Sequence, residues 1–206
     1  MNKPRFNLTK EEQRIFERLN SPSKIQDYLN TIPINFEKKG DTAMSPRRVL
    51  KEKKAHCLEG AMFASAVLWY HGKKPVLLDL KSTKEDYDHV VAIFKEDGRY
   101  GAISKTNHAV LRYREPIFRT IRELALSYFH EYFNNKGIKT LRSYSKPFSL
   151  SKYGHAWITA TEDLYEIGAE LDDIKHFPIL TKSNIKKLRT ADKIEIKAGL
   201  LTEYKE

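Results

Sequence analysis

The chain has 206 residues, of which 40% are hydrophobic, and this is enough to bury the core of one domain. Its 37 Lys and Arg exceed its 27 Asp and Glu and give a net charge of +10, so nucleic acid has to be considered as a partner. The single cysteine excludes an internal disulfide and leaves no basis for a cysteine-rich metal site. We expect one domain over residues 1–206.

The distribution of polar and charged residues narrows the class further. The first residues are polar and lack the apolar stretch of a secretory signal. The longest apolar run, residues 61–70, is about half the length that a bilayer-spanning helix needs. Basic residues are spread along the chain with acidic residues between them, and we find no nucleic-acid-binding fingerprint. We therefore expect a cytoplasmic protein with no membrane contact and a basic, solvated surface.

Helix-start signals dominate the first quarter of the chain. Thr9 and Glu12 form a capping-box pattern ahead of an apolar face, which predicts a first helix. Ser-Pro pairs at residues 21–22 and 45–46 predict the starts of a second and a third helix. A fourth helix is predicted from Cys57 to a stop at Gly72. Its residues 61–70 are apolar nearly all round, so it belongs in the middle of the domain.

Strand signals follow this helix. Residues 75–80 predict a buried strand, and residues 89–95 and 99–105 predict a hairpin joined through Asp97-Gly98. With a two-residue turn, position 91 faces position 104, which puts His89 and Ser104 on the same face of the hairpin. A three-residue turn would break that parity. We expect the His89 ring at a strand edge, near solvent.

The second half carries weaker signals. A long helix is predicted from Pro116 to just before Gly137, and a second hairpin from residues 156–161 and 164–168. Residues 184–196 fit a helix and a strand equally well. Early helices and later antiparallel strands together predict an α+β fold with a central helix packed on an antiparallel sheet.

Cys57 is the candidate nucleophile. At a helix start, unpaired N–H groups and the positive end of the helix dipole favour a thiolate, which is the nucleophilic form of cysteine. The flanking His56, Lys53 and Lys54 would lower its pKa further. The alternative is a small buried core residue, which is what a lone cysteine usually is. His89 tips the balance, because a thiol nucleophile needs an imidazole to take its proton and a polar group, here Ser104, to orient the ring.

These residues carry a resemblance to a known family. The stretches HCLEGAMFASAVLWYHGKKPVLLDL (56–80) and DHVVAIFKEDGRYGAISKT (88–106) resemble the catalytic core of the transglutaminase-like superfamily. In that family a cysteine opens a central helix, a histidine opens a strand and an acidic residue lies on the next strand. The resemblance implies a papain-like fold with its core at about 45–115. It also implies acyl transfer from a peptide or protein amide through a Cys57 thioester, with no cofactor and no metal.

Two positions depart from the family pattern. Ser104 stands where the family carries aspartate, and Asn107 is the alternative third member. A neutral third group leaves open a catalytically weak or inactive protein that binds a peptide, and a basic nucleic-acid-binding protein with a structural Cys57 is the further alternative. His155 competes with His89 as the base, because residues 154–157 (GHAW) also resemble the family's His-x-Trp strand start. We prefer His89, since the strand after it fits the pattern better.

Overall fold

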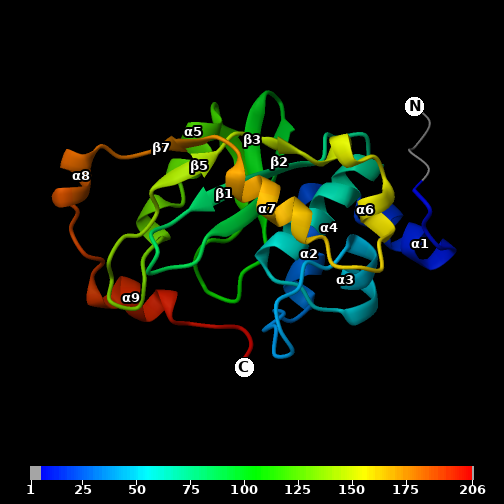
Figure 1. Cartoon of the computed structure of the whole chain (residues 1–206), viewed down its shortest axis with the longest axis horizontal. Coiled ribbons are helices and arrows are strands. Elements are labelled where there is room, and N and C mark those ends of the chain that lie inside the picture. The colour runs from blue at the N-terminus through cyan, green and yellow to red at the C-terminus, as the bar shows by residue number, and fades with distance from the viewer. Residues whose placement is uncertain (1–5, 206) are drawn as a thin grey trace.

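A computed structural model describes residues 6–205 of the chain. The protein is α+β: a seven-stranded sheet, antiparallel in all its pairings, lies between a group of N-terminal helices at one end and the last helices of the chain at the other (Figure 1). None of the described helices combines the length and the apolar character that crossing a membrane requires.

The first three helices start where the sequence predicts. Thr9, Ser21 and Ser45 are the N-cap residues, and each side-chain oxygen accepts the backbone N–H of the residue three positions later. Glu12 completes the capping box at Thr9. The helices are α1 (Lys10–Arg18), α2 (Pro22–Thr31) and α3 (Pro46–Glu52).

Helix α4 (Cys57–Tyr70) runs through the centre of the helical end. Nearly all of its residues are buried, which explains an apolar surface on every side. Gly72 follows it with φ of 83°, a left-handed conformation that suits glycine and ends the helix as predicted. The sequence prediction for this element is confirmed from its first residue to its last turn.

The central hairpin also matches its prediction. Asp97 and Gly98 both have positive φ, 45° and 77°, as a two-residue type I′ turn requires. Val91 therefore pairs with Ser104. The strand order is β4-β3-β2-β1-β5-β7, and β6 pairs with β1. The strands are β1 (Val76–Lys81), β2 (His89–Glu96), β3 (Arg99–Ser104), β4 (Arg114–Phe118), β5 (Ser143–Ser145), β6 (Phe148–Ser149) and β7 (His176–Pro178).

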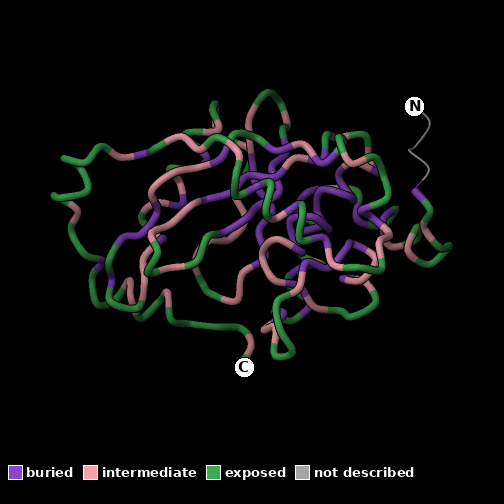
Figure 2. The backbone as a smooth tube through the Cα atoms, in the orientation of Figure 1, coloured by how far each residue is buried: buried purple, intermediate pink, exposed green. Residues whose placement is uncertain are grey.

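The sheet separates two apolar cores. Leu77 and Val90 face the core that contains α4 and the N-terminal helices. Their neighbours Leu78 and Val91 face the opposite core, which is completed by aromatic side chains such as Tyr128. Figure 2 shows the buried backbone concentrated in the sheet and around α4. Apolar packing on both faces of the sheet thus fixes β2 and β3, whose ends lie near the first turn of α4.

The predicted helix from Pro116 onward is wrong in its first part. Pro116 lies in β4, an edge strand, where a residue without an N–H is tolerated. Thr120 then caps the short helix α5 (Ile121–Leu126), and a 3₁₀ turn, η1 (Phe129–Glu131), follows. The apolar spacing in this segment is real, because Leu124, Tyr128 and Tyr132 are buried in the second core.

The predicted second hairpin is also wrong. After the 3₁₀ turn η2 (Leu150–Tyr153), residues 156–168 form α6 (Ala156–Thr159) and the start of α7 (Tyr165–Asp173). Ile167 and Leu171, four residues apart, are both buried, and that spacing selects a helix. Residues 184–196, left undecided from sequence, fall on two helices, α8 (Lys182–Lys186) and α9 (Lys193–Gly199).

Candidate active site

A cleft of about 820 Å³ opens where α4 and β2 begin. Cys57 and His89 line it, although 31 residues separate them in the chain (89 − 57 − 1). Further lining residues come from the loop before α4, from the end of β3 and from the C-terminal helix; they include His56, Lys105, Asn107, Tyr132 and Leu200.

Cys57 is the first residue of α4 and is half-buried. Burial by itself raises the pKa of its thiol, but hydrogen bonds and charge from His56 and His89 outweigh burial and lower the pKa to about 5. The positive end of the helix dipole, at the start of α4, also favours the thiolate and so lowers the pKa of the thiol further. A pKa of about 5 favours the thiolate form of the chain's only cysteine at neutral pH.

His89 opens β2 and contacts the residue expected to orient it. Its Nε2 lies 2.8 Å from Ser104 Oγ. Ser104 Oγ in turn donates its single proton to the Leu111 carbonyl at 2.6 Å, so His89 Nε2 must be the donor to the hydroxyl. This leaves Nδ1 as the ring nitrogen available for proton transfer. The ring is not near solvent as expected: His89 is only 7% exposed, because it is enclosed between the two strands and the cleft wall.

His56 is a second imidazole beside the thiol, and sequence reasoning gave it only a supporting role. It is the N-cap residue of α4, and its Nε2 lies 3.0 Å from the Thr42 carbonyl oxygen. Burial lowers its pKa, but the hydrogen bond and negative charge of Cys57, together with the Glu59 carboxylate, raise the pKa to about 9. The signal in the sequence was the capping pattern of residues 56–59, a histidine with glutamate three positions on.

Glu59 anchors this end of the helix. It is fully buried. Its carboxylate accepts the backbone N–H of His56 at 2.9 Å and that of Met44 at 3.0 Å, as well as the Thr42 hydroxyl at 2.7 Å. Glu59 thus supports the N-terminus of α4, and the same contacts fix the loop that precedes the helix.

A glycine lets β3 approach the first turn of α4. A Cβ on Gly60 would lie 2.5 Å from Lys105 Cβ, so no larger residue fits while Lys105 stays in place. Lys105 is itself buried, and its ammonium donates to the carbonyl oxygens of Leu29 and Ile32 at the end of α2. These hydrogen bonds tie the residue after β3 to α2, while Gly60 lets the same residue lie against α4, the helix that carries Cys57.

The structure places the alternative third member elsewhere. The Asn107 side chain donates to the Tyr204 carbonyl oxygen and accepts the Tyr204 N–H, both at 2.9 Å. Its amide group is thus paired with the C-terminal segment instead of with His89. Asp86 and Asp88, in the loop before β2, accept from Thr140 Oγ1 and from the Ser82 N–H, each in a loop-bracing hydrogen bond.

His155 lies at the other end of α4. Its ring packs edge-on against Trp69, with centroids 4.5 Å apart, and against Phe6 at 5.0 Å. Trp69 is 12 residues along the helix from Cys57 (69 − 57), or about 18 Å of helix. The structure brings Cys57, His89 and Ser104 together and leaves His155 apart from them.

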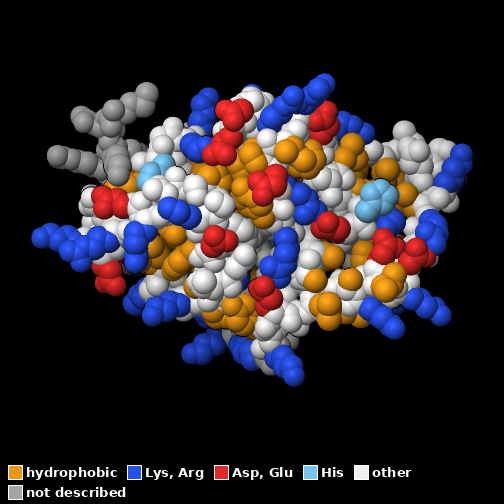
Figure 3. All heavy atoms as spheres, turned by 180° about the vertical axis from the view of Figure 1, so that it is seen from behind, with side chains coloured by type: hydrophobic (Ala, Val, Ile, Leu, Met, Phe, Trp, Pro, Cys, Tyr) orange, Lys and Arg blue, Asp and Glu red, His pale blue; other side chains and the backbone are white. Residues whose placement is uncertain are grey.

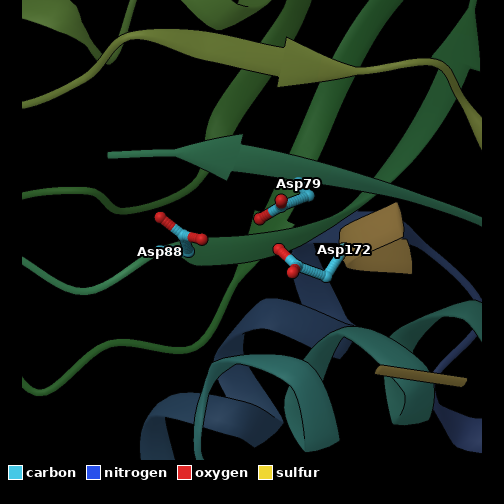
Figure 4. Close-up of side chains that lie close together, drawn as sticks. All are labelled: Asp79, Asp88 and Asp172. Atoms are coloured by element: carbon cyan, nitrogen blue, oxygen red, sulfur yellow. The ribbon is translucent and has the colours of Figure 1, made fainter. Parts of the chain in front are cut away.

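Three carboxylates converge on the helix α7 side of β1. Figure 4 shows Asp79, Asp88 and Asp172 turned toward one another, and one oxygen from each lies within 4.8 Å of the others. Oxygen ligands of this kind suit Mg²⁺ or Ca²⁺. However, the Lys81 ammonium pairs with Asp172, and His176 Nε2 lies 2.9 Å from Asp79 Oδ2, so two of the three carboxylates already have a partner within the chain. We assign no metal to it.

Comparison with known proteins adds no identity. No family model matches the chain, and no curated protein matches it in sequence. We therefore infer a function from the geometry of the cleft.

Proposed function

We propose that the chain is a cysteine acyl-transfer enzyme of the transglutaminase-like, papain-like type, acting on a peptide or protein amide. The observation that carries this proposal is the juxtaposition of a thiolate-forming Cys57 at a helix start with an oriented imidazole, His89, in an open cleft. The order of elements supports it, since nucleophile, base and orienting residue lie on the central helix, the start of β2 and the end of β3.

The chemistry follows from these groups. The Cys57 thiolate attacks the carbonyl carbon of the amide, and the unpaired N–H groups at the start of α4 stabilise the oxyanion. His89 Nδ1 gives a proton to the leaving amine as the C–N bond breaks, and a thioester forms. Water or a second amine then attacks the thioester, gives its proton to His89 Nδ1, and releases the thiolate.

Alkylation of the folded protein tests the nucleophile. Iodoacetamide should modify Cys57 rapidly at pH 6, well below the pKa of about 8.5 for free cysteine. Incubation with p-nitrophenyl acetate should give an acyl group on Cys57, located by mass spectrometry of a peptide digest, and a Cys57→Ser variant should show none. Modification of Cys57 only after unfolding would mean that the residue is structural and would end the proposal.

A peptide-binding protein with weak or no catalysis is the second candidate. The neutral hydroxyl of Ser104 favours it, because a hydroxyl stabilises an imidazolium less than a carboxylate does. The two candidates separate on turnover: a binding protein forms the acyl group on Cys57 once and releases it no faster than hydrolysis of a model thioester. Repeated turnover supports the enzyme.

Nucleic acid binding is the less favoured alternative. It rests on the net charge of +10. Figure 3 shows Lys and Arg side chains dispersed over one face, with Asp and Glu among them, and not gathered into a single stripe. Several basic groups also pair with carboxylates, as Arg47 does with Glu12 and Arg48 with Asp163. Binding to DNA or RNA that weakens steeply with salt would support this alternative.

A further inference from the structure

The site presents two imidazoles to one sulfur, and their hydrogen bonds differ in kind. The partner of His89 Nε2 is the Ser104 hydroxyl, a neutral acceptor whose own proton is given to Leu111. Such a partner fixes the orientation of the ring in both protonation states but does little to favour the charged one.

The surroundings of His56 favour a cation. Its Nε2 donates to the Thr42 carbonyl, an acceptor with no proton to give, so this nitrogen always carries hydrogen. Carboxylate oxygens lie close to the same nitrogen, Glu59 Oε1 at 3.4 Å and Glu37 Oε1 at 3.7 Å. The other nitrogen, Nδ1, is then left on the side of the neighbouring Cys57, whose negative charge raises the pKa of His56.

We propose that the two histidines divide the work: His56, backed by Glu59, is a fixed cation that holds the Cys57 thiolate, and His89 is the imidazole that moves the proton. The inference rests on the proposed acyl-transfer function. It explains how the site manages without a carboxylate on His89. The negative charge that the family pattern places behind the base is found here behind His56.

The protons of the reaction balance without His56 gaining or losing one. In acylation His89 passes its Nδ1 proton to the leaving amine and becomes neutral, while sulfur forms the thioester bond. In deacylation Nδ1 takes a proton from the attacking water or amine, and the C–S bond breaks to return the thiolate beside His56. His56 keeps both of its protons throughout, and the Ser104 hydroxyl accepts from His89 Nε2 at every stage.

Other charged and titratable groups face this pair. Asp163, from the loop before α7, interacts electrostatically with His56 and is itself paired with Arg48. Tyr132, which follows η1, faces Cys57, and the charge of Cys57 adds to burial in raising the pKa of that phenol. Neither changes charge between pH 5 and 7 in its ordinary range, and burial lowers the pKa of Lys105, which lines the same cleft, only to about 8. A thiolate titration between pH 5 and 7 therefore reports on the histidines.

The pH profile of Cys57 alkylation by iodoacetamide tests the division. His56→Gln removes the cation and should move the midpoint up by about 1 to 3 pH units, whereas His56→Lys keeps a positive charge and should restore most of the shift. His89→Gln should move it less. The same variants with p-nitrophenyl acetate give a second readout, because p-nitrophenolate leaves without a proton: His89→Gln should keep the burst and lose turnover by about 100-fold or more.

The wild-type protein supplies a measurement that needs no variant. By NMR, the His56 ring should keep its imidazolium shift up to about pH 9. A midpoint that moves with His89→Gln and not with His56→Gln, or a His56 ring that is neutral at pH 7, would overturn the inference and leave the proposed function standing. Slow alkylation of the wild type below pH 8 would instead overturn the proposed function.

Discussion

Histidine side chains lie near both ends of helix α4, and the two ends differ in what surrounds the imidazole rings. At the Cys57 end, His56 hydrogen-bonds to the Thr42 carbonyl and His89 to the buried Ser104 hydroxyl, beside a cleft of about 820 Å³. At the Trp69 end, a smaller hollow of about 490 Å³ lies beside an aromatic cluster, and His155 packs on rings instead. Hydrogen-bond acceptors thus surround the histidines at the Cys57 end of the helix, and aromatic rings surround His155 at the Trp69 end.

The difference teaches how to choose between histidines that look alike in sequence. Both His89 and His155 stand at the start of a plausible element next to hydrophobic residues. A proton-transfer role needs an acceptor that fixes the tautomer and leaves one nitrogen free, and only His89 has it, in Ser104. Ring-on-ring packing at His155 provides contact area but fixes no proton.

We expect the largest effect on the acyl-transfer rate when alanine substitutions of His89 and His155 are compared. His89→Ala should lower the acyl-transfer rate by about 10² to 10⁴-fold, because it removes the proton carrier. His155→Ala should leave the rate within about twofold. Steady-state assays on a peptide amide, with circular dichroism to check folding, measure both. A loss of activity in His155→Ala alone would reverse the assignment of the base.

A stability measurement probes the other end of the helix. Trp157 is 3% exposed, stacks on Trp69 with centroids 6.4 Å apart, and donates its indole N–H to the Gly154 carbonyl. Trp157→Ala should lower the free energy of unfolding by about 3 to 5 kcal/mol, measured with urea. The pH midpoint of Cys57 alkylation should not move. A shifted midpoint would show that the two ends are coupled.

Asp79, a buried carboxyl group on β1 in the sheet against which α4 packs, gives a separate pH test of stability. Burial raises the pKa of Asp79 to about 6, against the opposing effect of His176. The folded protein thus binds this proton more tightly than the unfolded chain, whose carboxyl pKa is about 3.9. The resulting stabilisation is present below pH 4 and is lost as the pH rises through 6.

Asp79→Asn keeps an acceptor for His176 and removes this titration. The variant should gain about 2 to 3 kcal/mol relative to the wild type between pH 4 and pH 7. Urea unfolding at the two pH values measures the change. Equal pH dependence in both proteins would mean that the Asp79 carboxyl is already ionised at pH 4.

The smallest expected effect concerns the neutral partner of His89. Ser104→Asp places a carboxylate beside His89 Nε2, so the NMR titration of that ring should move up by about one pH unit. The gain is limited because a carboxylate cannot donate to the Leu111 carbonyl as the hydroxyl does. Asn107→Asp is the matched control and should do less, since the Asn107 side chain is paired with Tyr204. An unmoved titration in Ser104→Asp would show that residue 104 does not face the ring in solution.

The N-terminal half was predictable because its signals are local. Caps at Thr9, Ser21 and Ser45 and the turn at residues 97–98 each depend on a few neighbouring residues. The second half is set by the sheet: Pro116 became an edge-strand residue because β3 offered a free edge.

The candidate site divides in the same way. Strand parity was enough to put Ser104 beside His89. The charge on His56 was not accessible from its neighbours, because it depends on how the loop before α4 folds. That loop brings the Thr42 carbonyl and the Glu37 carboxylate to the ring, from 14 and 19 residues away (56 − 42 and 56 − 37).

The absence of a side chain at Gly60 sets the clearance on which the whole arrangement depends. Helix α4 and the end of β3 touch there with no room for one added methyl group. A Gly60→Ala substitution would push apart the helix that carries Cys57, the proposed nucleophile, and the strand that carries Ser104, without altering either side chain. A misplacement of about 1 Å can lower a rate about 100-fold. We therefore expect the added carbon atom to reduce the reaction rate more than it reduces the stability of the fold.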